Sequence, residues 1–178
     1  FGEMLTFKRL LAQTRSAKQR QALLAGKVED MINTVVRQIA FYTFERAIHT
    51  ERKNGELTAE RIGQIWLSVQ GESLGPAIDI RPGYENFWMY IPHFIHSPFY
   101  VYAYAFGDCL VNSLYAVYQQ ASDGFAERYL DMLAAGGTKH YTELLKPFGL
   151  DARDPKFWQG GLSVIEKIID ELEEIDRR

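Results

Sequence analysis

A short stretch between His93 and Phe106 gathers the side chains most able to do chemistry, namely His93, His96, Tyr100, Tyr102 and Tyr104. A hydrophobic core needs apolar bulk, and imidazole or phenol groups cost free energy when they are buried without hydrogen-bond partners. The same groups can transfer protons or donate hydrogen bonds to a developing oxyanion. We therefore interpret this stretch as the lining of a wet cleft that contacts a ligand.

The spacing of the two histidines leaves three uses open. On a helix, residues three apart share a face, so His93 and His96 could bind a metal ion together. Pro92 and Pro98 flank the pair and argue against a regular helix, and no cysteine or carboxylate lies close in sequence to complete a metal site. Contact with substrate by at least one histidine is favoured, and a hydrogen-bonded structural role is the third use.

The three tyrosines alternate along the chain. On a helix, Tyr100 and Tyr104 share a face while Tyr102 points elsewhere. Rings at this spacing can simply fill a core. Beside His93, a phenol hydroxyl can instead stabilise the oxyanion of a reacting carbonyl.

Other polar side chains are interpreted as solvated or structural, and the histidines and acids among them are His49, His140, Glu29, Asp30 and Glu45. Cys109 has no neighbouring histidine and is interpreted as a small core residue. Arg81 lies in a loop with proline and glycine and could bind a carboxylate.

Helical spacing of apolar residues recurs along almost the whole chain, and no stretch shows convincing strand alternation. The sequence therefore predicts an all-α fold. The longest predicted helix runs from Ser16 to about Lys53, and Thr58 is predicted to cap the next one, which ends at Gly71. Residues 74–98 are predicted to be a loop-rich aromatic segment because proline and glycine interrupt them repeatedly.

Cap residues divide the remainder of the chain. Ser122 or Asp123 is expected to cap one helix and Thr138 a short one. Asp154 is expected to cap the last helix, with Pro155 at its first position, where the missing N–H costs nothing.

The composition bounds the class of protein. The chain has 178 residues, of which 47% are hydrophobic, so one helical domain over residues 1–178 is expected. The net charge of −3 gives no basic surface for nucleic acid, and no apolar run is long enough for a membrane helix. A single cysteine excludes an internal disulfide and fits a reducing compartment, so a cytoplasmic location is expected.

The chain resembles the C-terminal part of oligoendopeptidase F, in the thimet-oligopeptidase-like family of zinc metallopeptidases. The likeness rests on residues 91–94 and 99–107, supported by the Gly75–Pro76 loop and by residues 1–3. In that family a segment of the form Glu-Thr-Ala-Ser-x-Phe-x-Glu follows the zinc helix, and residues 1–3 are similar to its end. The resemblance covers essentially the whole chain.

The resemblance implies a nearly all-helical enzyme with a deep substrate channel, in which two histidines of a His-Glu-x-x-His motif and a later glutamate hold zinc. The motif glutamate activates a zinc-bound water. A His and Tyr loop faces the metal across the cleft, binds a short peptide and stabilises the tetrahedral intermediate. By position His93 matches the histidine of that loop and Tyr104 its stabilising tyrosine, whereas Tyr100, Tyr102 and His96 are expected to contact substrate.

All three zinc ligands and the catalytic glutamate of the family pattern would precede Phe1. We therefore expect this chain to be a C-terminal lobe that works with a missing N-terminal lobe, and that alone neither binds catalytic zinc nor cleaves peptides. The alternative is a non-catalytic helical module that binds peptides or another ligand on the His/Tyr stretch. A purely structural bundle would require His93 and Tyr104 to be buried and mutually satisfied.

Overall fold

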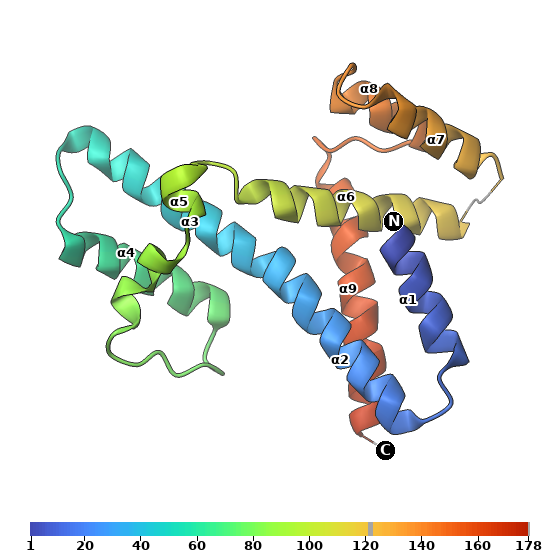
Figure 1. Cartoon of the computed structure of the whole chain (residues 1–178), viewed down its shortest axis with the longest axis horizontal. Coiled ribbons are helices and arrows are strands. Elements are labelled where there is room, and N and C mark those ends of the chain that lie inside the picture. Colours follow the sequence, from blue (N-terminus) through green and yellow to red (C-terminus); the bar gives the residue numbers. More distant parts are fainter. Residues whose placement is uncertain (121–122, 178) are drawn as a thin grey trace. The chain divides into compact units, whose positions relative to one another are not determined.

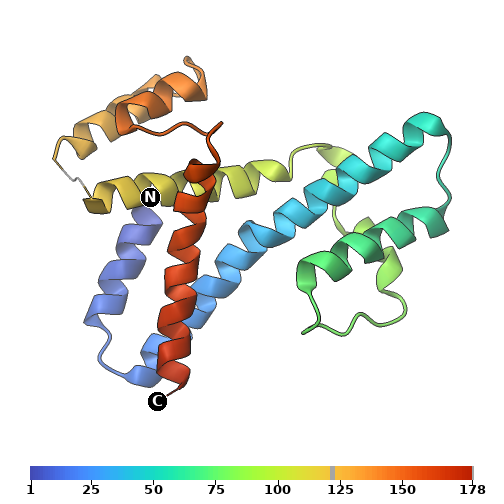
Figure 2. The same cartoon turned by 180° about the vertical axis from the view of Figure 1, so that it is seen from behind.

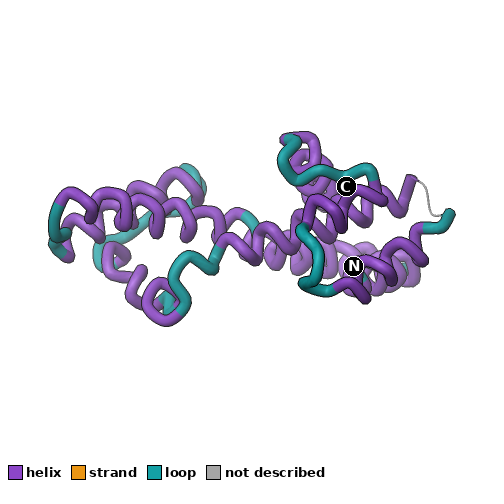
Figure 3. The backbone as a smooth tube through the Cα atoms, turned by 90° about the horizontal axis from the view of Figure 1, so that it is seen from above, coloured by secondary structure: helices purple, strands orange, loops and turns teal. Residues whose placement is uncertain are grey.

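The computed structural model describes residues 1–120 and 123–177, and within these ranges the chain forms helices, turns and loops without any strand (Figure 3). The predicted all-α fold is confirmed. None of the helices in these ranges has both the length and the apolar character to cross a membrane. Two compact units emerge: unit 1 contains residues 1–31 and the chain from Gly107 onward, and unit 2 contains residues 32–106. The single domain over residues 1–178 stays a prediction.

Unit 2 is built on an antiparallel pair of helices, α3 and α4 (Figure 1). Its elements are α3 (Val36–Glu51), η1 (Arg52–Asn54), α4 (Ala59–Leu74), η2 (Tyr84–Tyr90), α5 (His93–His96) and the first turn of α6 (Tyr102–Gln120). The buried core consists of Phe41, Phe44, Ile65, Trp66, Ile91 and Val101. Ile91 and Val101 stand on either side of α5, so the core anchors both ends of the segment that carries the histidines.

Two helix bounds in and beside this unit differ from the prediction. The long helix from Ser16 is interrupted at Val35, a turn residue with φ −101° and ψ −68°, between α2 (Ala17–Thr34) and α3. Helix α4 passes Gly71 and ends at Leu74, and the φ of +67° at its C-cap, Gly75, suits glycine. The cap at Thr58 is confirmed, because its side chain accepts a hydrogen bond from the N–H of Arg61.

Unit 1 contains α1 and α9 together with parts of α2 and α6 and the short helices that follow α6 (Figures 1 and 2). Its remaining bounds are α1 (Gly2–Gln13), α7 (Phe125–Ala135), α8 (Tyr141–Leu145), η3 (Lys146–Phe148) and α9 (Pro155–Asp176). Leu114, Phe125 and Phe148 form a buried cluster. Helix α9 approaches α6 very closely at Gly161, where an added Cβ would lie 2.8 Å from the carbonyl oxygen of Cys109.

The predicted caps of unit 1 have mixed outcomes. Asp154 caps α9 as predicted, since its side chain accepts from the N–H of Lys156. Helix α7 has Gly124 at its N-cap and not Asp123, while Ser122 lies outside the described residues. Thr138 was also predicted wrongly, because α8 starts only after His140; the Thr138 hydroxyl donates to the carbonyl oxygen of Ala135.

Candidate active site

His93 stands at the start of α5, a single helical turn. The expectation that no regular helix forms here was wrong for this one turn: the N–H of His96 donates to the carbonyl of Pro92 at 2.9 Å. Pro92 is tolerated because a residue preceding the helix needs no N–H of its own. Phe94 packs against the rings of Phe41 and Phe44 in the core. Because Phe94 fixes the rotation of the turn, the preceding side chain, His93, is free to point elsewhere.

Tyr104 lies on the first turn of α6, and burial of the residues around it sets its direction. Val101 and Ala105, four residues apart, are both buried. Val101 directly precedes α6, and residues at this spacing share one helix face, so the buried face at the start of α6 is the one on the side of Val101 and Ala105. Tyr104 is consequently left at the edge of that face, 39% exposed.

His93, Tyr100 and Tyr104 form one mutually contacting group, which we call the ring face. His93 Nε2 and the Tyr104 hydroxyl are 3.0 Å apart, a hydrogen bond whose direction depends on the imidazole tautomer. The Tyr100 ring lies parallel to the imidazole at a centroid distance of 6.2 Å, and the Tyr104 ring is nearly perpendicular to both. The structure thus brings together three of the five residues that the sequence singled out.

The exposure of the ring face counts against a purely structural role. A structural bundle requires His93 and Tyr104 to be both hydrogen-bonded and buried, and only the first condition is met. Tyr104 is 39% exposed and Tyr100 is 51% exposed, while His93 is half-buried. The paired polar groups therefore meet solvent, where a ligand can reach them.

The hydrogen bond gives the pair a defined chemical capability. If His93 carries its proton on Nε2, the imidazole donates to the tyrosine oxygen, and the phenol O–H is left free to donate outward. Hydrogen bonds in such a chain polarise one another, which makes the outer hydroxyl a better donor to a developing oxyanion. The opposite tautomer would direct the phenol proton at the imidazole.

The other two candidate residues have surroundings of their own. The Tyr102 ring contacts Tyr42 of α3 at 6.3 Å, and His96 is exposed at the end of α5. Within residues 1–120 and 123–177, no three His, Cys, Asp or Glu side chains come together in a way that could hold a metal ion. The pairing of His93 with His96 on a metal accordingly has no third ligand in the described part of the chain.

Glu45 of α3 is a polar residue that the sequence interpretation missed. It was expected to be a solvated charge, but it is fully buried, and its Oε1 accepts a hydrogen bond from the N–H of Phe99 at 2.7 Å. A signal was present in the sequence. Phe41, Phe44 and Ile48 mark the apolar face of this helix, and Glu45 falls inside that face.

Most of the remaining interpretations agree with the structure. Cys109 is buried, and burial together with the negative charge of Asp108 raises its pKa to about 11, so the thiol is a core group. His140 is exposed, and half-buried His49 packs its ring against Phe99 at 4.7 Å. The exposed Arg81 pairs with Asp79.

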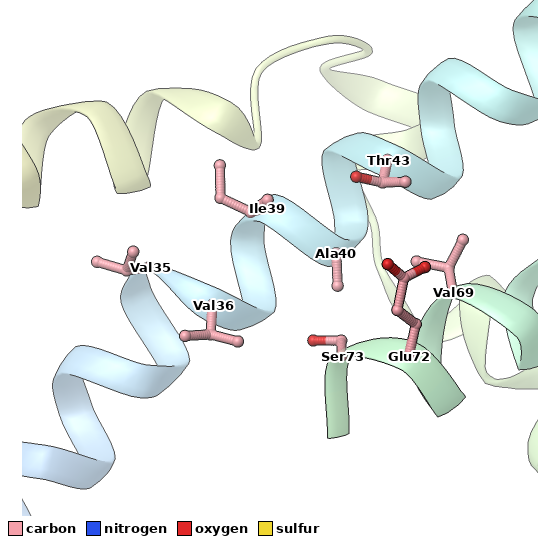
Figure 4. A pocket seen from close by; sticks show the side chains of 8 residues that line it. All are labelled: Val35, Val36, Ile39, Ala40, Thr43, Val69, Glu72 and Ser73. Carbon is pink, nitrogen blue, oxygen red and sulfur yellow. The ribbon is translucent and has the colours of Figure 1, made fainter. Parts of the chain in front are cut away.

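A hollow of unit 2 lies between α3 and α4 (Figure 4). This hollow of about 350 Å³ is lined by Val35, Val36, Ile39, Ala40, Thr43, Val69, Glu72 and Ser73. Glu72 is the one titratable group among these lining residues, and neither His93 nor Tyr104 belongs to them. An apolar hollow with one carboxylate offers no set of groups for acid–base chemistry.

Comparison with known proteins adds a family and a fold. Residues 1–164 match Peptidase family M3. The chain is 32% identical over 177 residues to oligopeptidase PepF of Bacillus subtilis (strain 168), and 28% identical over 175 residues to the plasmid-encoded oligoendopeptidase F of Lactococcus lactis subsp. cremoris. Each similarity covers 98% of this chain.

This chain is also similar in structure to a solved protein. The crystal structure of oligoendopeptidase-F from Enterococcus faecium matches with a TM-score of 0.87 and 28% sequence identity, over 97% of this chain and 33% of that one. The chain spans only 26% of the Bacillus relative and 29% of the Lactococcus relative. The similarity therefore concerns one part of those longer proteins.

Proposed function

Because the chain belongs to peptidase family M3, we propose that it works as the C-terminal part of a zinc-dependent oligoendopeptidase that hydrolyses short peptides. The observation that carries this proposal is the hydrogen bond between His93 and Tyr104 on an exposed ring face. The names of the relatives support peptide substrates, since both are called oligopeptidases or oligoendopeptidases.

In the proposed reaction, the ring face binds the substrate and stabilises the transition state. Tyr104 donates a hydrogen bond from its hydroxyl to the carbonyl oxygen of the scissile bond as negative charge develops there. His93 holds the tyrosine oxygen in place by donating from Nε2, and Tyr100 offers an exposed ring against which the peptide packs. Tyr102 and His96 are proposed to contact more distant parts of the substrate. A donor already fixed in position needs no reorganisation during the reaction, which is why such donors accelerate it.

Zinc is proposed for the longer protein and not for this chain. This division is supported by the described residues, among which no group of three side chains able to hold a metal comes together. We propose that the ligands come from another region of the longer protein, which the family resemblance puts before this chain. The small share of each relative that the chain spans is consistent with such a region. That region is the proposed partner of this chain. We also propose that units 1 and 2 belong to one catalytic domain and that the longer protein is cytoplasmic.

The decisive experiment uses the full-length protein that contains this chain and an internally quenched short peptide. We expect turnover that a chelator abolishes and added zinc restores, and a loss of kcat in His93→Gln, whose amide keeps some hydrogen bonding but lacks the imidazole. The 178-residue chain alone is expected to show no cleavage. Peptide binding without metal-dependent turnover would instead favour the non-catalytic binding module, and wild-type kcat in His93→Gln would remove His93 from the mechanism.

A further inference from the structure

A buried carboxylate on α3 fixes the loop that joins α5 to α6. Glu45 is 0% exposed, and its Oε1 accepts a hydrogen bond of 2.7 Å from the backbone N–H of Phe99. This distance is at the short end of the usual range for an N–H···O hydrogen bond. The carboxylate thus holds one backbone atom of the loop at a defined place.

The residue that it holds has a conformation that needs support. Phe99 has a φ of +62°, and it is the one non-glycine residue with positive φ in the described part of the chain. Residues with a Cβ rarely adopt this region, and they remain there only where the surrounding structure enforces it. The Phe99 ring also packs against His49, one turn beyond Glu45 on the same helix. Helix α3 consequently constrains both the backbone and the ring of Phe99.

This constrained residue lies between the two groups of the proposed active site. On one side, the N–H of Ser97 donates to the carbonyl of His93 at 3.0 Å and closes the α5 turn. On the other side, the buried side chain of Val101 anchors the start of α6, which carries Tyr104. Phe99 therefore lies within the short connection between the residues that carry the imidazole and the phenol.

We infer that Glu45 is a positioning residue: its carboxylate holds Phe99 in the left-handed conformation and thereby sets the hydrogen-bonded approach of His93 to Tyr104. The expected effect of Glu45 on turnover rests on the proposed function. Its effect on the position of His93 relative to Tyr104 does not. Glu45 acts through the loop and makes no contact with substrate.

The second carboxylate oxygen supports a geometric role over a packing role. Glu45 Oε2 is buried and has no hydrogen-bond partner in the described structure. A buried carboxylate with an unpaired oxygen destabilises a fold relative to an apolar side chain of similar size. A residue whose only task was to fill this part of the core would therefore be better replaced by leucine or methionine.

The test compares three substitutions in the full-length protein, with peptide turnover as the first measurement. Glu45→Gln keeps an oxygen that can accept from the Phe99 N–H, and its kcat is expected to stay within about threefold of wild type. Glu45→Met removes the acceptor at similar length, and kcat is expected to fall about tenfold to a hundredfold, the cost of a small misplacement of catalytic groups, with KM nearly unchanged. Glu45→Asp retains the charge on a shorter side chain and should fall between the two.

The matched control is Glu51→Gln on the same helix. Glu51 pairs with Arg61 at the surface, so its loss should leave kcat and KM at wild-type values. Retention of wild-type kcat in Glu45→Met overturns the inference. So does an equal loss in Glu45→Gln and Glu45→Met, because the charge and not the hydrogen bond would then matter.

A second measurement follows the geometry without relying on activity. The ¹⁵N signals of the His93 imidazole report its hydrogen bond to Tyr104, and we expect them to shift in Glu45→Met and to remain in place in Glu45→Gln. Unchanged signals in Glu45→Met overturn the inference. If His93→Gln keeps full turnover, the proposed function fails, and the imidazole signals of the Glu45 variants still decide whether Glu45 positions the pair.

Discussion

Two of the aromatic clusters in this molecule differ in exposure and in polar contacts. The ring face of unit 2, formed by His93, Tyr100 and Tyr104, is open to solvent and contains a hydrogen bond between an imidazole nitrogen and a phenol hydroxyl. The second group surrounds Phe125 in unit 1 and includes the rings of Phe1, Tyr118, Tyr129 and Phe148. Phe125 itself is only 2% exposed.

The comparison shows that ring density does not by itself identify a site. Both groups use stacked and edge-to-face contacts at centroid distances of about 5–6 Å, which is the usual geometry of aromatic packing. What distinguishes the ring face is a polar pair that stays accessible. We therefore expect substitutions in the two groups to affect different quantities: turnover for the ring face and free energy of unfolding for the Phe125 cluster.

Among such substitutions, Phe125→Ala is expected to have the largest effect. Removing a fully buried phenyl ring that contacts four other rings should lower the free energy of unfolding by about 3–5 kcal/mol. Urea denaturation followed by circular dichroism measures the change, and Leu130→Ala, at an exposed position of the same helix, is the control. At a temperature where the variant remains folded, turnover per folded molecule of the full-length protein should match wild type. A specific loss of turnover would break the division between the two groups.

Tyr104→Phe is expected to show the reverse pattern. It removes one hydroxyl while keeping the ring, so stability should change little. Loss of a donor to the oxyanion typically lowers kcat by about 10²–10³. The control is Tyr118→Phe in the Phe125 cluster, which removes a hydroxyl from a half-buried ring and should leave kcat intact. Equal kcat values for the two variants would mean that the ring face has no special chemical role.

The sequence was sufficient to predict the all-α fold and the segment of the ring face, because both depend on local patterns. Apolar spacing marks the helices, and proline-bounded density of His and Tyr marks residues 91–107. The contact of His93 with Tyr100 and Tyr104, and the separation of Tyr102 from them, could not be read in the same way. These depend on how one turn of helix and a left-handed Phe99 connect α5 to α6.

The role of Glu45 was out of reach for a related reason. Its partner, the N–H of Phe99, is distant in sequence, and a single glutamate on a helix is usually solvated. Only its place among Phe41, Phe44 and Ile48 hinted at burial. The break at Val35 carried no local signal at all, since neither proline nor glycine stands there.

Gly161→Ala tests how closely the helices α9 and α6 pack in the interior of unit 1. The added Cβ would lie 2.8 Å from the Cys109 carbonyl oxygen and 3.2 Å from Ser113 Oγ, so the backbones of α9 and α6 must separate. Such overpacking is expected to cost about 1–3 kcal/mol of unfolding free energy. The adjacent Gly160→Ala meets nothing within 4 Å and should be neutral or slightly stabilising, because alanine favours a helix over glycine. Equal melting temperatures for the two variants would contradict the close approach of the helices.

Asp108→Asn is expected to have the smallest effect, and its pH dependence carries the information. Burial raises the pKa of Asp108 and is the dominant influence on it, while the charge of Lys27 and the hydrogen bond from Asn112 act in the opposite direction. The folded chain thus holds the Asp108 proton more tightly than the unfolded chain. The stability that this proton provides is complete below the unfolded pKa of about 4 and is lost as the pH rises through the folded pKa.

At neutral pH the ionised Asp108 consequently weakens unit 1, and asparagine, which can still accept from Asn112, should relieve this. We expect Asp108→Asn to be more stable than wild type at pH 7, by less than about 1 kcal/mol because the carboxylate is partly solvated. The difference should vanish below about pH 4. Urea denaturation at a series of pH values measures it, with Asp154→Asn as a control that alters a carboxylate at an exposed helix cap. A variant less stable than wild type at pH 7 would mean that attraction to Lys27 outweighs burial, and the interior of unit 1 would then rely on charge as the ring face relies on its polar pair.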